Sequence, residues 1–201
     1  ALTHYTEEGA VYRIDFNLRP YGSAGEWVCS KSQLLDYYKS QASCWEVQAT
    51  LKMKPIAGSW WVGFSFIQEL KPIAMTKYSP QILLHSIRVL RTEAVKKVNE
   101  RVFAGVNIKS GEGGIRDIEF LVQGLQLAYQ STHPEILQRS TLKGIRQLKN
   151  AKLIPSDSGD QLIRYYLFFR RIEHFLQLLE DRQTHHLPQD PHEVSVLARR
   201  I

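Results

Sequence analysis

The residue best suited to metal-assisted chemistry is Asp15, which lies in the segment Val-Tyr-Arg-Ile-Asp-Phe-Asn-Leu-Arg over residues 11–19. Apolar residues occupy the even positions and polar residues the odd ones, which predicts a half-buried strand with one polar face. A carboxylate on that face could bind a divalent cation while Arg13 and Arg19 contact phosphate. One carboxylate is too few for such a site, so an exposed Asp15 paired with its neighbouring arginines is the alternative.

A second polar pattern is the string Gly113-Gly-Ile-Arg-Asp-Ile-Glu-Phe120, in which glycines precede an amphipathic segment. Glycines ahead of a helix can expose backbone N–H groups to an anion, and the alternative is a tight turn into a packed helix. The string is not a Walker loop, because no Gly-Lys-Ser/Thr follows it. Along the helix, four polar residues form a stripe that is predicted to face solvent: Glu119, Gln123, Gln126 and Gln130.

The segment 181–188 contains two adjacent histidines, His185 and His186, and His192 lies nearby. Neighbouring side chains in a helix point about 100° apart and cannot easily share one ion, so zinc binding is disfavoured. A serine nucleophile is not signalled either, because no G-x-S-x-G string occurs.

Composition and charge narrow the class of protein. The chain has 201 residues, of which 43% are hydrophobic, and a net charge of +6, with basic residues spread out rather than clustered. A globular protein with a solvated basic surface, no membrane span and no secretory signal is expected. Cys29 and Cys44 are expected to be reduced thiols. Three tryptophans are interpreted as core or interface residues rather than base-stacking platforms: Trp45, Trp60 and Trp61.

Helices are predicted to position most of these residues. Apolar spacings of three and four predict helices over five segments: 33–40, 83–98, 115–129, 141–151 and 162–179. Ser32 is predicted to cap the first, and Ser158 with Gln161 resembles a capping box for the last. Residues 45–54 fit either a helix or a strand. Glycine and prolines place an internal boundary in the range 56–80.

Several strings resemble, in the same order, those of the bacterial glutamine-synthetase adenylyltransferases. The segment from Tyr12 to Gly25 is similar to that family's R-x-D-x-R-L-R-P-x-G-x-x-G motif, and Gly113 to Gln123 is similar to its most distinctive string. Arg171-Ile-Glu-His and Asp181-x-Gln-Thr-His185 resemble parts of its helical domain. The resemblance covers the chain from about residue 10 to its end.

The resemblance implies an α+β chain that is predominantly α. Residues 1–60 would hold the rear strands of a polymerase-β-type nucleotidyltransferase domain. Residues 61–201 would form a helical bundle that orients the protein substrate or couples to regulators. The family's G-S-x-x-D-x-D loop, which supplies two of three metal-binding carboxylates, does not occur here. The chain is therefore expected to be a fragment of a longer enzyme and inactive alone.

The implied reaction is the addition of AMP to a tyrosine of glutamine synthetase, or its removal by phosphorolysis, in the cytoplasm. Asp15 would be a catalytic residue and the third metal ligand, and Arg13 and Arg19 would bind the nucleotide. The cofactors would be Mg²⁺ and ATP, or phosphate with the AMP-modified substrate. Glutamine synthetase and the regulator PII are the implied partners, with neither nucleic acid nor membrane involved.

Four positions depart from the family pattern, and each departure removes a charge or a bidentate donor. Asn17 and Lys54 stand where Arg is usual, Val47 where Arg or His is common, and Ser59 where Asp is found. Two alternatives stay open. One is a relative of the PII uridylyltransferases, which share the fold type, and the other is a non-catalytic regulatory or protein-binding module.

Overall fold

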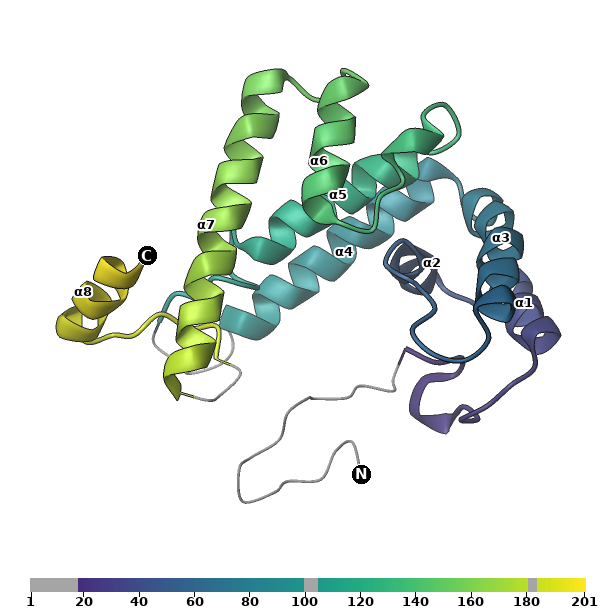
Figure 1. The fold of residues 1–201 in the computed structure, drawn as a ribbon, viewed down its shortest axis with the longest axis horizontal. Coiled ribbons are helices and arrows are strands. Elements are labelled where there is room, and N and C mark those ends of the chain that lie inside the picture. Colours follow the sequence, from purple (N-terminus) through teal and green to yellow (C-terminus); the bar gives the residue numbers. More distant parts are fainter. Residues whose placement is uncertain (1–17, 100–104, 181–183) are drawn as a thin grey trace. The chain divides into compact units, whose positions relative to one another are not determined.

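The computed structural model describes residues 18–99, 105–180 and 184–201. Within these ranges the chain forms eight α-helices and two short 3-10 helices. The α-helices are labelled in Figure 1. The only β pairing among the described residues is a single antiparallel bridge between Asn107 and His186. The predominantly helical part of the predicted fold class is thereby confirmed.

The predicted strand over residues 11–19 falls almost wholly outside the described residues. Its last two positions, Leu18 and Arg19, are described and lie in a turn, so the strand does not extend to them. Pro20 follows directly, and the chain reverses at the 3-10 helix η1 (Gly22–Ala24). The polymerase-β-type strands therefore stay a prediction.

The described residues form two compact units. Unit 1 comprises residues 18–47 and 54–77, and unit 2 comprises residues 48–53 and 78–201. The change between Lys77 and Tyr78 falls inside the predicted boundary range of 56–80. That range is nevertheless mostly helix rather than linker, and the assignment of residues 1–60 to a nucleotidyltransferase domain stays a prediction.

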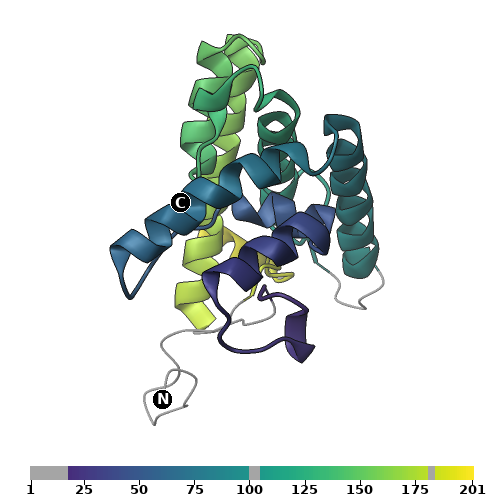
Figure 2. The same cartoon turned by 90° about the vertical axis from the view of Figure 1, so that its right-hand side faces the viewer.

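Unit 1 contains helix α1 (Lys31–Ser40) and helix α3 (Trp60–Thr76), which lie against each other, as Figure 2 shows. Helix α2 (Cys44–Thr50) begins in this unit, so residues 45–50 adopt the helical alternative. Leu35 and Tyr38 of α1 and Leu70 of α3 are buried, which confirms the predicted apolar face of the first helix.

The cap of α1 differs from the predicted one. Ser30, rather than Ser32, accepts a hydrogen bond from the Gln33 backbone N–H, and the Gln33 side chain accepts one from the Ser30 N–H at 2.8 Å. The reciprocal pair requires Gln or Glu three residues after the cap, and only Ser30 satisfies that spacing here. The helix consequently begins at Lys31, two residues before the predicted start at residue 33.

Helix α3 continues through one of the prolines that suggested a boundary in the range 56–80. Pro72 lies inside the helix, and the buried Leu70 and Ala74 flank it. Burial of these apolar side chains favours continuing the helix past a residue that lacks an N–H. The core interpretation is wrong for Trp60 and Trp61, which are 70% and 74% exposed, whereas an interface role for them stays a prediction.

Unit 2 is a bundle of five helices: α4 (Pro80–Asn99), α5 (Ile115–Tyr129), α6 (Thr141–Asn150), α7 (Ser156–Glu180) and α8 (Pro191–Arg200). The predicted helices of this region are confirmed. Helix α5 contacts α4, α6 and α7, so it lies at the centre of the unit (Figure 1). One core joins α5, the 3-10 helix η2 (Pro134–Ile136) and α6 through Ile118, Val122, Ile136, Ile145 and Leu148.

Two details of α7 differ from expectation. The helix begins at Ser156, so Ser158 lies inside its first turn and the capping box predicted with Gln161 is wrong. Tyr165, expected on the buried stripe, is mostly exposed, and Ile163 and Tyr166 contact the core instead. The chain also has no described helix whose length and hydropathy would suit a membrane span.

We expect Ser30→Ala to lower the free energy of unfolding by about 1 kcal/mol, because the Gln33 backbone N–H at the start of α1 loses its acceptor. Ser32→Ala, at the cap position suggested by the sequence, should change stability by less than about 0.5 kcal/mol. Urea unfolding of both variants measures the difference. Equal effects would show that the capping box does not stabilise α1.

Candidate functional site

Arg19 is the one predicted site residue that the structure describes. Its Nε donates to the Gly25 carbonyl at 3.0 Å and its Nη2 to the Ser23 carbonyl at 3.1 Å. Its guanidinium also lies 4.5 Å from the centre of the Trp27 ring. Arg19 therefore closes the loop after Pro20. Asp15 and Arg13 lie outside the described residues, and the metal and nucleotide roles of all three stay predictions.

The glycine turn before α5 uses its backbone donors internally. Four consecutive N–H groups find acceptors within the chain: Gly113 on Asp117 Oδ2, Gly114 on the Gly111 carbonyl, Ile115 on the Ile108 carbonyl and Arg116 on the Lys109 carbonyl. These donors are therefore not available to an anion. The tight turn into a packed helix, the alternative to an anion site, is confirmed.

Asp117 joins this turn to α4. Its carboxylate accepts from Arg91 Nε at 3.2 Å and Nη2 at 3.1 Å, and from the Gly113 N–H at 2.9 Å. Burial opposes ionisation of Asp117, but these hydrogen bonds outweigh burial and lower its pKa. The acidic residue of the family string thus fixes the start of α5 against the preceding helix.

The polar stripe of α5 is buried at Gln126 and Gln130 and half-buried at Glu119 and Gln123, so the prediction that it faces solvent is wrong. Gln126 is 1% exposed and donates to the carbonyls of Ile136 and Gln138 at 2.6 and 3.0 Å. Glu119 accepts from the Tyr166 hydroxyl at 2.9 Å. The stripe thereby supplies donors to two carbonyls of the connection before α6, whose only described helical element is the short η2.

The segment after α2 joins unit 2 through the same stripe. Gln48 donates to Gln123 at 2.6 Å, and Lys52 Nζ donates to the Arg139 carbonyl at 2.7 Å and to Thr141 Oγ1 at 3.1 Å. Burial lowers the pKa of Lys52, and Glu119 opposes that shift. These contacts explain why residues 48–53 group with unit 2 although their neighbours on both sides belong to unit 1.

The positions that depart from the family pattern are partly described. Val47 is fully buried, so a charged side chain there would lose its hydration. Ser59 precedes α3 as its N-cap residue, without a hydrogen bond from its side chain to the helix. Asn17 lies outside the described residues.

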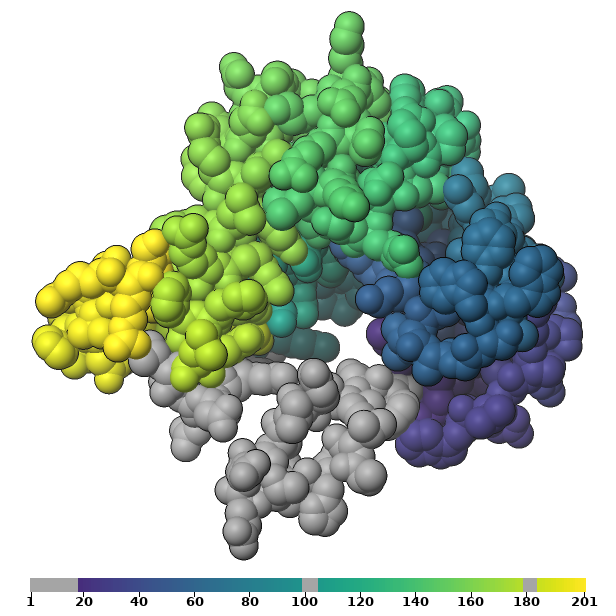
Figure 3. Space-filling view, viewed as in Figure 1, coloured from purple at the N-terminus to yellow at the C-terminus, as the bar shows by residue number. Residues whose placement is uncertain are grey.

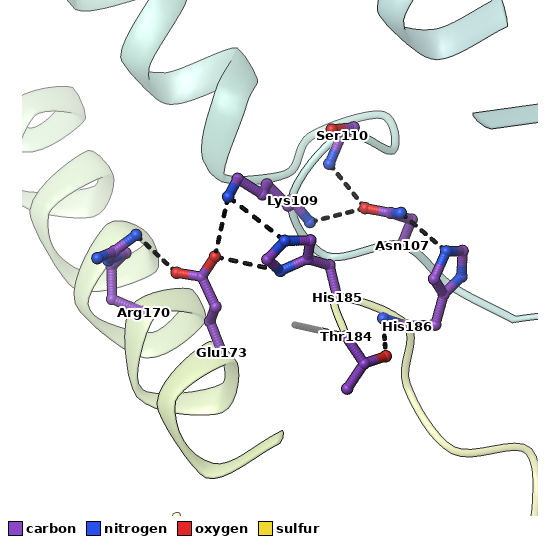
Figure 4. A network of polar contacts seen from close by, with 8 residues as sticks. All are labelled: Asn107, Lys109, Ser110, Arg170, Glu173, Thr184, His185 and His186. Atoms are coloured by element: carbon purple, nitrogen blue, oxygen red, sulfur yellow. Dashed lines mark hydrogen bonds and ion pairs between the residues drawn. The ribbon is translucent and has the colours of Figure 1, made fainter. Parts of the chain in front are cut away.

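A buried carboxylate, Glu173 of α7, collects three basic side chains (Figure 4). The residue is 2% exposed, and Arg170 Nη1 lies 2.6 Å from its Oε2. Lys109 Nζ and His185 Nδ1 lie 3.5 and 3.3 Å from its Oε1. One acidic group therefore holds together α7, the loop before α5 and the segment after α7.

Asn107 reinforces this arrangement on the loop side. Its Oδ1 accepts from the backbone N–H groups of Lys109 and Ser110 at 3.1 and 2.8 Å, and its Nδ2 lies 3.0 Å from His186 Nε2 (Figure 4). The Ile108 N–H donates to the His185 carbonyl at 2.9 Å. Two strings singled out in the sequence, Arg171-Ile-Glu-His and the segment 181–188, thus meet the loop before α5 in one polar cluster, which we call the Glu173 cluster.

The two histidines of the cluster point to different partners. His185 faces Glu173 and Lys109, whereas His186 faces Asn107 (Figure 4). Burial and the nearby Lys109 lower the pKa of His185, with Glu173 opposing them, so its imidazole is neutral at pH 7. Within the described ranges no group of three or more metal-ligating side chains converges.

The spacing of the strings did not predict this convergence. The sequence contained one signal, because Glu173 lies between Arg170-Arg171 and the apolar Leu176 on a helix whose neighbouring Ile172 faces the core. A carboxylate beside a buried stripe must find positive partners. Which basic residues supply them depends on the path of loops that have no periodicity.

Comparison with known proteins defines the class. Residues 85–201 match the family model described as GlnD PII-uridylyltransferase, and residues 1–69 match that of glutamate-ammonia ligase adenylyltransferase. Both descriptions name nucleotide-transferring enzymes. Such a match across both halves agrees with the order of motifs along the chain.

Curated relatives refine this class. The chain is similar to proteins named bifunctional glutamine synthetase adenylyltransferase/adenylyl-removing enzyme from three bacteria. The identity is 37% over 94% of the chain for the protein of Mesorhizobium japonicum, 35% over 94% for that of Hahella chejuensis and 36% over 99% for that of Nitrosomonas europaea. The chain belongs to the glutamine synthetase adenylyltransferase family, which confirms the resemblance drawn from its motifs. It spans 19–21% of the length of these relatives.

Glu173→Gln should lower the free energy of unfolding by about 2–3 kcal/mol, because Lys109 and Arg170 then lose their shared counter-charge. Glu69→Gln, which removes one exposed partner of Lys31, is the matched control and should cost less than about 1 kcal/mol. Urea unfolding measures both. A Glu173 effect no larger than the control would show that the cluster does not hold the three segments together.

Gly114→Ala should destabilise the protein by about 2–3 kcal/mol, because the added Cβ would lie 2.6 Å from the Ile108 carbonyl oxygen and 3.0 Å from that of Gly111. Gly113→Ala meets open space but must adopt a φ of +71°, and should cost about 1 kcal/mol. Thermal unfolding ranks the two. The reverse order would contradict the geometry of this turn.

Stability should fall as the pH decreases. The pKa values of Asp117 and His185 are both lowered in the folded protein, so the unfolded chain binds more protons in acid. Urea unfolding at about pH 7, 4 and 2.5 measures the loss. The part due to His185 is lost below about pH 6.5, and the part due to Asp117 below about pH 4, where Asp117→Asn should lose less stability than the wild type. The exposed Asp157→Asn is the control and should keep the wild-type pH dependence.

Proposed function

We propose that the protein of which this chain is part transfers AMP to and from glutamine synthetase. The observation that carries the proposal is an identity of 35–37% over 94–99% of the chain with enzymes that bear this name. The match runs through both units, so the proposal does not depend on one motif. The protein would act in the cytoplasm, and PII would be a regulatory partner.

In this proposal Asp15 holds Mg²⁺ together with carboxylates from outside the chain, and Arg13 and Arg19 contact phosphate oxygens. Bound magnesium would neutralise charge that develops on the phosphates during in-line transfer. ATP would be the donor in one direction, and phosphate would attack the AMP-modified protein in the other. The described residues offer no metal cluster of their own, so this assignment rests on Asp15.

The helical unit would orient the protein substrate. Its interior is held by directional polar contacts, since the Glu173 cluster and the stripe of α5 both join segments distant in sequence. Such contacts favour one arrangement of helices over alternatives that apolar packing alone would permit. Large apolar side chains remain exposed on α7, including Leu167, Phe168 and Leu178, which suits contact with a macromolecule.

Asp15→Asn in the whole protein should reduce both AMP transfer to glutamine synthetase and its phosphorolytic removal at least about 1000-fold if this domain catalyses both, because an amide binds Mg²⁺ far less well than a carboxylate. Radiolabelled AMP incorporation and release measure the two directions. Loss of one direction alone would assign the domain to that reaction.

The exposed Asp157→Asn is the control, and it should retain wild-type rates in both directions. Circular dichroism and urea unfolding of Asp15→Asn test whether the fold is intact. Wild-type rates in a folded Asp15→Asn protein would contradict the metal-ligand role.

A second candidate is uridylyl transfer to PII, and the observation that favours it is the family model matched by residues 85–201. The two functions differ in nucleotide and in acceptor. Incubation of the whole protein with ATP or UTP, and with glutamine synthetase or PII, separates them. Transfer of UMP to PII without transfer of AMP would favour the second candidate, and transfer of neither would favour a binding module.

A further inference from the structure

A groove with a volume of about 630 Å³ lies along the C-terminal half of α7 and the end of α8. Helix α8 is held there by Leu197, which is buried against Ile172 and Leu176 of α7. Figure 3 shows α8, in yellow, beside this half of α7. We propose that this groove binds an acidic amphipathic helix of a protein partner, an interaction that goes beyond nucleotide transfer and does not depend on it.

The floor of the groove is apolar. Leu167, Phe175 and Leu178 line it, and their spacings of eight and three residues place them along one side of α7. Leu178 is 79% exposed and Leu167 is 49% exposed. Leucines exposed together on one helix face are typical of a surface that a partner covers. An apolar floor of this kind suits the leucine or isoleucine side chains of a partner.

The charged groups of the groove are all basic. Arg170, Arg171 and Arg200 line it together with His174, and no acidic side chain is among its lining residues. Glu173 holds Arg170, while Arg171 Nη1 donates to the Ile201 carbonyl at 3.0 Å. Both guanidinium groups are therefore positioned in advance and retain further N–H donors. Positioned arginines beside an apolar strip are common among the residues that dominate binding energy.

These features specify the occupant. A helix that presents apolar side chains at i, i+4, i+7 and i+11 would cover the leucines, and glutamates beside that stripe would meet the arginines. A nucleic acid would satisfy the arginines but leave the leucines in contact with its phosphates. The combined apolar and basic lining therefore favours an acidic protein helix over a polyanion.

The test uses a synthetic helical peptide of about 15 residues, with leucine at the four stripe positions and glutamate beside them. A matched peptide carries lysine in place of glutamate. Fluorescence anisotropy with the whole protein should show binding of the glutamate peptide and at least about tenfold weaker binding of the lysine peptide. Binding should weaken with ionic strength, since the charged pairs lie at the surface.

Variants locate the binding surface. Leu178→Ser and Arg171→Glu should each weaken binding of the glutamate peptide at least about tenfold. Two changes on the same helix but outside the groove, Phe168→Ser and Arg164→Glu, are matched controls and should change affinity less than about twofold. The altered side chains are exposed, so circular dichroism should show all four variants folded.

Several results would overturn the proposal. They are equal binding of the two peptides, no binding of the glutamate peptide, or equal effects of the groove variants and their controls. A single-stranded oligonucleotide of equal charge could instead bind more tightly than the glutamate peptide. If that binding were lost in Arg171→Glu and kept in Leu178→Ser, the groove would be a polyanion site. Nucleotide transfer is not measured in this experiment, so its outcome is separate from that of the proposed reaction.

Discussion

The charge of Glu173 is the constraint on which the arrangement of the C-terminal unit depends. A carboxylate in a water-excluded position is unfavourable unless positive groups surround it. Lys109 and Arg170 supply that charge, and the neutral His185 is a third partner. Each of the three comes from a different segment. The path of the loop before α5 and that of the segment after α7 follow from this requirement. The Asn107 contacts and the single β bridge then fix both segments in register.

A second polar system works by the same rule on the other side of α5. Gln126 donates to the Ile136 and Gln138 carbonyls in the connection between α5 and α6. Lys52 reaches the start of α6, where Arg139 and Thr141 lie. Both sets of contacts require their partners in one geometry, whereas apolar packing tolerates slippage between helices. The helices of the unit are thereby held in one arrangement.

The contacts of the family strings give their residues distinct physical roles. In the glycine string, Gly114 permits a close approach to the Ile108 carbonyl and Asp117 ties the turn to Arg91. Glu119 of the same string faces Tyr166 inside the bundle. These residues build the helical unit, and the proposed chemistry rests on Asp15 in a separate part of the chain. A long distinctive motif can therefore mark a scaffold and not a reaction centre.

The sequence by itself determined the helices of the bundle, because their apolar residues recur with the period of an α-helix and burial selects that face. It also determined the family, because long strings occur in a set order. It predicted the cap of α1, the start of α7 and the uninterrupted course of α3 less well. A serine or proline is compatible with several local structures, and tertiary packing decides which one forms. Only the tertiary structure decided that the polar stripe of α5 is buried and that Lys109, Glu173 and His185 meet. Periodicity shows that a face is polar, but what lies opposite that face depends on the path of the intervening loops.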